Sequence, residues 1–191
     1  MGKPVRVGMV GLGQRGLQHL KALWALQEAG VVEIVGLGDV FEGNLTEEKL
    51  GRYVSGIKLD GIGTFTDFDR LFDETRPDAM YFAIPPGFHN GEVVRTAQAG
   101  VHIFAEKPMS LFLDEAIEMN RAIREAGVIS TAGFQRRYEV QSGVAHTFLA
   151  EKRMVAVTMV SESLLEGHSV KHSQTSDKGG PADKVWAKNF A

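Results

Sequence analysis

Three glycines near the N-terminus have the spacing of a loop that binds phosphate groups. The residues read Gly11-Leu12-Gly13-Gln14-Arg15-Gly16, between an apolar run and an amphipathic helical pattern. Gly11 permits a tight turn, Gly13 lets backbone amides approach an anion without a Cβ in the way, and Gly16 lets the helix pack close to the strand. The unpaired amides and positive dipole end of the helix would bind the anion. All six residues are candidate contacts to the pyrophosphate of a dinucleotide, although Arg15 fits a solvated first-turn residue equally well.

A carboxylate, Asp39, follows the second β-rich run of the sequence. In a dinucleotide site an acidic side chain at this place accepts hydrogen bonds from the adenosine ribose hydroxyls and repels a 2′-phosphate. Val40 and Phe41 come next, so no adjacent Arg or Lys is present to bind that phosphate. The pattern favours NAD as the cofactor over NADP, which stays open. The alternative is that Asp39 is only a solvated strand end.

Two turns further along the chain also end apolar runs. The first contains Ile84, Pro85, Pro86 and His89, and the second contains Glu106, Lys107 and Pro108. Ligands of open α/β sheets bind at the carboxyl ends of the strands, so both turns should face the same cofactor. His89 either lines that pocket or caps the following helix. Glu106 and Lys107 are either site residues or a surface ion pair at a strand end.

The elements that must position these residues alternate between strand and helix patterns. Strands are predicted at 5–10, 31–37, 62–65, 79–84, 101–105 and 128–132. Helices are predicted between them at 15–29, 44–52, 89–99 and 114–125, with a further helix that Thr66 or Asp67 caps. This alternation is typical of repeated βαβ units and of a parallel sheet with helices on both faces. We therefore predict an α/β fold, with a Rossmann-type doubly wound parallel sheet in a dinucleotide-binding domain at 1–135.

The regular pattern changes after Phe134. A helix is predicted to about Lys152, followed by a strand at 154–163, and together they indicate that residues 136–191 are only the start of a second, α+β domain. Residues 166–191 hold few large apolar side chains, so we expect this tail to be poorly ordered by itself. The strand at 154–163 would have an unpaired edge that could bind a second copy, which leaves homo-oligomer formation open.

The composition argues against several other classes of protein. Lys and Arg total 21 against 24 Asp and Glu, for a net charge of -3, so the charge balance does not favour nucleic acid or an acidic membrane surface as a partner. The chain has no Cys, which excludes disulfides, a thiolate metal site and a cysteine nucleophile. No apolar run approaches the roughly 18 residues of a membrane span, and no secretory leader is evident. We expect a cytoplasmic protein and assign no metal site.

Four motifs in a fixed order resemble those of the Gfo/Idh/MocA family, which is named for glucose-fructose oxidoreductase and inositol dehydrogenase. They are the glycine loop, the turn from Pro85 to His89, Glu106-Lys107-Pro108, and Gln135-Arg136-Arg137-Tyr138. The resemblance implies that Lys107 is catalytic: it lies beside the nicotinamide and the reacting hydroxyl and passes a proton while the cofactor carries the hydride. It also implies that Glu106 contacts the nicotinamide-side ribose, that Arg136 belongs to the cofactor site, and that the Lys107-Pro108 bond is cis.

The resemblance implies an NAD(P)-dependent oxidoreductase that acts on a hydroxyl of a sugar, polyol or related small carbohydrate. Family members normally continue into a second domain, which covers the nicotinamide and supplies an acid/base His in a Gly-x-His-x-x-Asp setting. That setting is missing here, because Gly167-His168 is followed by Ser, Val and Lys. We therefore expect a partial protein that holds mainly the cofactor-binding domain.

Two other functions fit the same residues. An NAD-dependent glycosidase of the same family also has a Gly-x-Gly-x-Arg-Gly loop, and it uses transient oxidation to assist cleavage of a glycoside. A non-enzymatic sensor would keep NAD(P) binding and contact a partner through residues 154–191. Net formation of NADH indicates a dehydrogenase, whereas hydrolysis without net cofactor turnover indicates the glycosidase.

Overall fold

A six-stranded parallel sheet forms the centre of the computed structural model, which describes residues 2–153, 155, 156 and 158. The strands are β1 (Val5–Val10), β2 (Val32–Gly38), β3 (Gly63–Phe65), β4 (Ala79–Phe82), β5 (His102–Ala105) and β6 (Ser130–Ala132). Their order is β3-β2-β1-β4-β5-β6, and every neighbouring pair is parallel. The predicted doubly wound sheet is confirmed. The order of the strands reverses between β1 and β4, and this is where such sheets bind their ligands.

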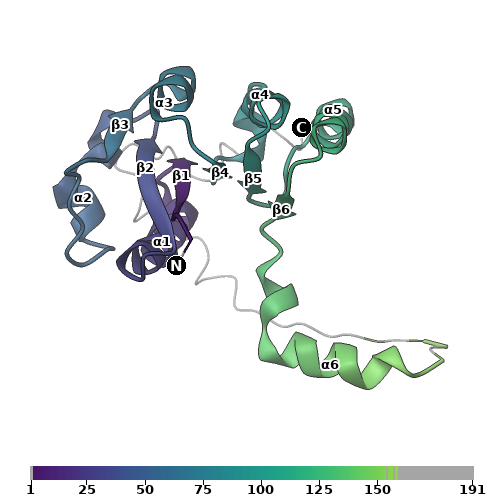
Figure 1. Cartoon of the computed structure of the whole chain (residues 1–191). Coiled ribbons are helices and arrows are strands. Elements are labelled where there is room, and N and C mark those ends of the chain that lie inside the picture. The colour runs from purple at the N-terminus through teal and green to yellow at the C-terminus, as the bar shows by residue number, and fades with distance from the viewer. Residues whose placement is uncertain (1, 154, 157, 159–191) are drawn as a thin grey trace.

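Helices cover both faces of this sheet. They are α1 (Gln14–Glu28), α2 (Glu47–Gly51), α3 (Phe68–Thr75), α4 (Glu92–Gln98), α5 (Leu113–Ala126) and α6 (Val140–Ala150), with short 3-10 turns η1 (Glu42–Leu45), η2 (Pro86–Phe88) and η3 (Gln135–Tyr138). Figure 1 shows α3, α4 and α5 together on one side of the sheet and α1 on the other. The strands therefore need apolar side chains on both faces, as the nearly continuous apolar runs predict.

The apolar core has one part on each face of the sheet. One part joins Met9 of β1 to Leu20 of α1 and Leu50 of α2. The other joins Leu71, Met80, Val93 and Met119, which come from α3, β4, α4 and α5. Since successive strand residues point to opposite faces, both parts draw on the same strands and hold the sheet edge rigidly in place.

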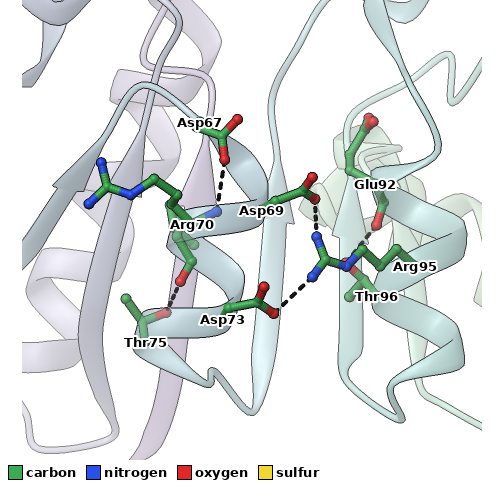
Figure 2. Close-up of polar contacts among 9 residues, drawn as sticks. Asp67, Asp69, Arg70, Asp73, Thr75, Glu92, Arg95 and Thr96 are labelled. Atoms are coloured by element: carbon green, nitrogen blue, oxygen red, sulfur yellow. Dashed lines mark hydrogen bonds and ion pairs between the residues drawn. The ribbon is translucent and has the colours of Figure 1, made fainter.

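An ion-pair cluster links α3 and α4 at the surface of the second face. Arg95 of α4 reaches across to Asp69 and Asp73 of α3, and its Nη2 lies 2.8 Å from the Asp73 carboxylate (Figure 2). The guanidinium also lies over the Phe68 and Phe72 rings, 5.8 Å and 5.4 Å from their centroids. This cluster joins two helices that carry none of the predicted site residues.

Several element boundaries differ from the sequence prediction for local reasons. The strand predicted to reach Ile84 ends at Phe82, because Pro85 and Pro86 follow and cannot donate to the sheet. The helix predicted from His89 begins at Glu92, after η2 and a left-handed Gly91. The helix predicted to face solvent at 44–52 is instead η1 followed by α2, and Leu50 is fully buried.

The chain after β6 continues through η3 into α6, which lies apart from the sheet and has no buried residue (Figure 1). Most of the strand predicted at 154–163, and all of the tail 166–191, lie outside the described residues. The division into domains at 1–135 and 136–191 stays a prediction. None of the helices in the described part of the chain is both long and apolar enough to cross a bilayer.

Candidate functional site

The glycine loop joins the end of β1 to the start of α1. Gly11 has a φ of +92°, and its N–H donates to the carbonyl of Gly38 at 2.8 Å. A Cβ at Gly11 would lie 2.5 Å from the carbonyl oxygen of Ala83, and a Cβ at Gly16 would lie 1.8 Å from that of Gly11. Both positions therefore require glycine, because the loop backbone is packed against the turn after β4 and against the first turn of α1.

Gly13 is different, because a Cβ there would meet no atom within 4 Å. The first intrahelical bond of α1 runs from the N–H of Leu17 to the carbonyl of Gly13, so the N–H groups of Gln14, Arg15 and Gly16 have no acceptor within the helix. The first turn has no acidic residue and its cap provides no side-chain acceptor. Free amides beside open space at a positive helix end fit the pyrophosphate of a dinucleotide.

Asp39 follows β2 directly and is buried, with 8% of its surface exposed. Its Oδ2 accepts a hydrogen bond from the N–H of Leu12 at 2.8 Å, and its Oδ1 accepts one from the N–H of Phe41 at 2.9 Å. The carboxylate keeps further lone pairs for ribose hydroxyls. The reading of Asp39 as a solvated strand end is therefore wrong. Its bond to the glycine loop could not be inferred from the sequence, because the two partners are far apart in it.

The turn after β4 lies against the glycine loop. A Cβ at Gly11 would come within 3.0 Å of Cγ2 of Ile84, so Ile84 packs directly beside the loop. Pro85 caps η2 and Pro86 begins it, which turns the chain away from the sheet. Ile84, Pro85 and Pro86 thus lie at the carboxyl edge of the sheet, beside the predicted phosphate site.

His89 faces the start of α4, with 2% of its side chain exposed. Its Nδ1 contacts Oε1 of Glu92, and the N–H of Asn90 donates to Oε2 of the same carboxylate at 2.6 Å. Burial by itself would raise the pKa of Glu92, but these hydrogen bonds outweigh it and lower that pKa. His89 thus contacts the first turn of α4 without capping it, because the cap residue is Gly91 and no side-chain hydrogen bond caps the helix. A place for His89 in the cofactor pocket stays a prediction.

Glu106 is the buried carboxylate at the end of β5, with 9% of its surface exposed. Its Oε1 lies 2.8 Å from Nε2 of His19 and 3.8 Å from Nε of Arg15, both on α1, and its Oε2 accepts from the N–H of Lys107 at 3.1 Å. A Cβ at Gly133 would lie 2.7 Å from this carboxyl group. The reading of Glu106 as part of a surface ion pair with Lys107 is therefore wrong.

Lys107 is exposed beside Glu106, and the Lys107-Pro108 bond is cis, as the resemblance implies. The glycine loop, Ile84 and Glu106 follow β1, β4 and β5, so they lie at one edge of a parallel sheet and Lys107 lies at that edge with them. Arg136 is exposed in η3, and within the described part of the chain no ion pair joins it to these residues.

His19 and Gly133 are the residues of this site that sequence reasoning missed. His19 lies on α1 one helical turn after Arg15, so helical spacing could have placed both side chains on one face of the helix. Nothing local to Gly133 in the sequence indicates a buried carboxylate beside it. Both become evident only when α1 and the end of β6 are placed next to β5.

Known proteins with similar sequences are NAD-binding oxidoreductases. Residues 5–134 match the GFO_IDH_MocA model, described as an oxidoreductase family with an NAD-binding Rossmann fold. The chain is 29% identical over 136 residues to scyllo-inositol 2-dehydrogenase (NAD(+)) of Bacillus subtilis, and 30% identical over 135 residues to myo-inositol 2-dehydrogenase of Thermotoga maritima. Each alignment covers 71% of this chain and 37% of the relative.

Solved structures agree with the sequence relatives. The crystal structure of myo-inositol 2-dehydrogenase from Lactobacillus plantarum superposes with a TM-score of 0.65 at 27% identity, over 78% of this chain and 41% of that one. The chain thus spans about two fifths of the length of the proteins it matches. With the family model covering most of its length, the chain belongs to the Gfo/Idh/MocA oxidoreductase family and carries that family's NAD-binding Rossmann domain.

Proposed function

We propose that this chain is the cofactor-binding part of an NAD-dependent oxidoreductase that acts on a hydroxyl group of a sugar or polyol. The observation that carries the proposal is the meeting of the glycine loop, Asp39 and the Glu106-Lys107 pair at one edge of the sheet. This edge includes the switch point at which doubly wound sheets bind dinucleotides. The relatives named as inositol dehydrogenases support the choice of a polyol as substrate.

Each group of site residues is proposed to bind a different part of the cofactor. The backbone amides of residues 13–16 bind the pyrophosphate, whereas the amide of Leu12 is already bonded to Asp39. Asp39 accepts from the adenosine ribose with its remaining lone pairs, and its negative charge disfavours the 2′-phosphate of NADP. Ile84, Pro85 and Pro86 line the centre of the site. Glu106 accepts from the nicotinamide-side ribose, and Arg136, in η3 after the edge strand β6, is the last proposed cofactor contact.

Lys107 is the proposed catalytic residue. Its ammonium group donates a hydrogen bond to the oxygen of the reacting hydroxyl and stabilises alkoxide character there as the proton leaves. Bound NAD would supply the acceptor for the hydride. Because the N–H of Lys107 is bonded to the Glu106 carboxylate, the backbone that carries the catalytic side chain is tied to the proposed ribose contact.

We assign the substrate contacts to a second domain that begins near residue 136, since the matched relatives are much longer than this chain. Binding of NADP, self-association and a cytoplasmic location stay predictions of the sequence. The glycosidase alternative is less well supported, because a relative named as a glycosyl hydrolase family 109 protein matches over 60% of this chain, against 71% for each of the two inositol dehydrogenases. The oxidoreductase family match likewise supports an enzyme over a sensor.

Calorimetric titration of the chain with NAD and with NADP tests the proposal. We expect saturable binding of NAD and weaker binding of NADP. Absence of saturable binding to both would overturn the proposal. Where NAD binds, a panel of polyols and glycosides separates the alternatives: NADH accumulation with a polyol supports the dehydrogenase, hydrolysis without net NADH supports the glycosidase, and neither reaction supports the sensor.

A further inference from the structure

We infer that His19 is a positioning residue that fixes the Glu106 carboxylate for the nicotinamide half of the cofactor. The inference rests on the proposed function and extends it to a residue on α1. The central observation is the 2.8 Å contact between Nε2 of His19 and Oε1 of Glu106, across 87 residues of sequence. A contact of this length between a ring nitrogen and a carboxylate oxygen is a charge-assisted hydrogen bond.

We assign the hydrogen atom of this contact to Nε2 of His19, because a carboxylate accepts hydrogen bonds and the ring nitrogen is the partner that can donate one. Glu106 is buried, and a buried carboxylate is costly unless its oxygens are hydrogen-bonded. His19 satisfies Oε1, the N–H of Lys107 satisfies Oε2, and the absence of a side chain at Gly133 leaves the room that the carboxyl group occupies.

The His19 ring is itself held by aromatic packing. It meets the Phe104 ring of β5 edge-on, with centroids 4.8 Å apart, and lies 6.2 Å from the Tyr81 ring of β4. Phe104 and Tyr81 stack on each other at 4.7 Å. The Phe104 and Tyr81 rings thus pack against the imidazole, and this packing sets the direction of its Nε2–H bond.

Arg15 is the other cation near Glu106, but its geometry is weaker. Its Nε lies 3.8 Å from Oε1, and its Nη1 donates to Oε1 of Gln18 at 2.6 Å. The Arg15 side chain is also more exposed than that of His19. Arg15 therefore adds positive charge near the carboxylate, whereas His19 sets its orientation.

Loss of the bond between His19 and Glu106 should affect only the binding of the nicotinamide half of the dinucleotide. Loss of the His19 hydrogen bond frees Glu106 to rotate and loosens its tie to the Lys107 backbone. Within the described residues no hydrogen bond or ion pair joins His19 to Asp39, whose carboxylate is held by the N–H groups of Leu12 and Phe41. NAD should therefore bind more weakly, while ADP, which lacks the nicotinamide and its ribose, should bind as before.

Two substitutions separate the hydrogen bond from the ring packing. His19→Phe keeps an aromatic ring against Phe104 and removes the donor. His19→Gln removes the ring and places an amide N–H at the same number of bonds from Cα as Nε2. Affinities for NAD and ADP are measured by calorimetry on the full chain, and thermal unfolding checks that each variant is folded.

We expect His19→Phe to bind NAD about tenfold more weakly with ADP unchanged, since hydrogen bonds to charged groups contribute on this scale. We expect His19→Gln to stay within about threefold of the unmodified chain, because its N–H can replace the lost donor. Unchanged NAD binding by His19→Phe overturns the inference. Equal weakening of NAD and ADP, or a Gln variant as weak as the Phe variant, also overturns it and assigns His19 to packing.

A measurement on the unmodified chain covers the case in which a variant does not fold. The imidazole N–H signal of His19, assigned by nuclear magnetic resonance, should shift on addition of NAD and stay in place on addition of ADP. An identical response to both ligands contradicts the inference. Failure of the unmodified chain to bind NAD removes the proposed function and the inference together, whereas NAD binding with an unaffected His19→Phe variant removes the inference alone.

Discussion

The Asp39 carboxylate and the backbone N–H of Leu12 lie 2.8 Å apart, although 27 residues separate them in the sequence. The acidic residue that follows β2 therefore fixes the glycine loop that follows β1. The proposed preference for NAD and the geometry of the loop therefore depend on the same side chain. A substitution chosen to change the preference for NAD will also affect the loop that is proposed to bind the pyrophosphate.

Asp39→Asn should lower both stability and NAD affinity. The N–H groups of Leu12 and Phe41 donate to different oxygens of the carboxylate, and asparagine replaces one of these oxygens by an NH2 donor, so one N–H loses its partner. We expect the free energy of unfolding to fall by about 1–3 kcal/mol, measured by urea denaturation. Asp60→Asn is the matched control, because Asp60 is exposed ahead of β3. Equal stability of the two variants would show that Asp39 does not hold the loop.

The glycine loop offers a pair of substitutions that separates binding from folding. Gly13→Ala should leave stability within about 0.5 kcal/mol, because its φ of -69° suits alanine and its Cβ meets no atom. It should nevertheless weaken NAD binding about tenfold or more, because the added methyl group enters the space proposed for the pyrophosphate. Calorimetry and thermal unfolding measure the two effects. Unchanged NAD affinity in a folded Gly13→Ala variant would place the pyrophosphate elsewhere.

Gly16→Ala should, unlike Gly13→Ala, act mainly on stability. Its Cβ would lie 1.8 Å from the carbonyl oxygen of Gly11, so the helix or the loop must move. We expect a loss of about 3 kcal/mol in unfolding free energy, at the upper end of the usual cost of overpacking. Urea denaturation beside Gly13→Ala provides the comparison. A Gly16→Ala variant as stable as Gly13→Ala would contradict the packing seen between the loop and α1.

Stability should fall at acid pH through Glu92. Burial is the largest influence on its pKa and would raise it, but the hydrogen bonds from His89 and Asn90 lower it below the usual 4.5. A carboxyl with a depressed pKa in the folded state stabilises the fold above the pKa of the unfolded chain, and this contribution is lost as pH falls through the lowered value. Unfolding free energies between neutral pH and pH values below 4.5 measure the loss.

Glu92→Gln isolates this contribution, because glutamine does not titrate. The variant should be less stable than the unmodified chain at neutral pH, and its stability should fall less steeply in acid. Parallel acid profiles for the two proteins would show that the loss comes from other carboxylates. Glu118→Gln, at an exposed position of α5, is the control for general charge effects.

Arg95→Met should affect stability but not the cofactor site. It removes the ion pairs with Asp69 and Asp73 and the contacts of the guanidinium with the Phe68 and Phe72 rings (Figure 2). The side chain is 38% exposed, so solvent screens these pairs and the cost should be only about 1 kcal/mol. The difference should shrink at high salt, and NAD affinity should not change. Arg121→Met, at an exposed position of α5, is the control and should change neither the free energy of unfolding nor the affinity for NAD.

The sequence determined the fold class and most of the cofactor loop. Apolar runs that alternate with helical patterns specify parallel βαβ units, because each strand must be buried on both faces. The need for glycine at Gly16 is likewise local, since a Cβ there would meet the carbonyl oxygen of Gly11, whereas a Cβ at Gly11 would meet Ala83 in the turn after β4, which is a tertiary contact. The edge of the sheet that carries Asp39, Ile84 and Lys107 follows from strand direction alone once the strands are known to be parallel.

Only the tertiary structure decided how the carboxylates are used. Glu106 is followed in the sequence by a lysine, but its carboxylate accepts only from the backbone N–H of Lys107 and pairs with the His19 side chain on α1. Asp39 reads as a ribose contact, but it also holds the amide of Leu12. Such pairings join residues far apart in the chain. A buried carboxylate needs hydrogen-bond donors in place of water, and its partners are therefore the donors that the packed helices and strands bring within reach.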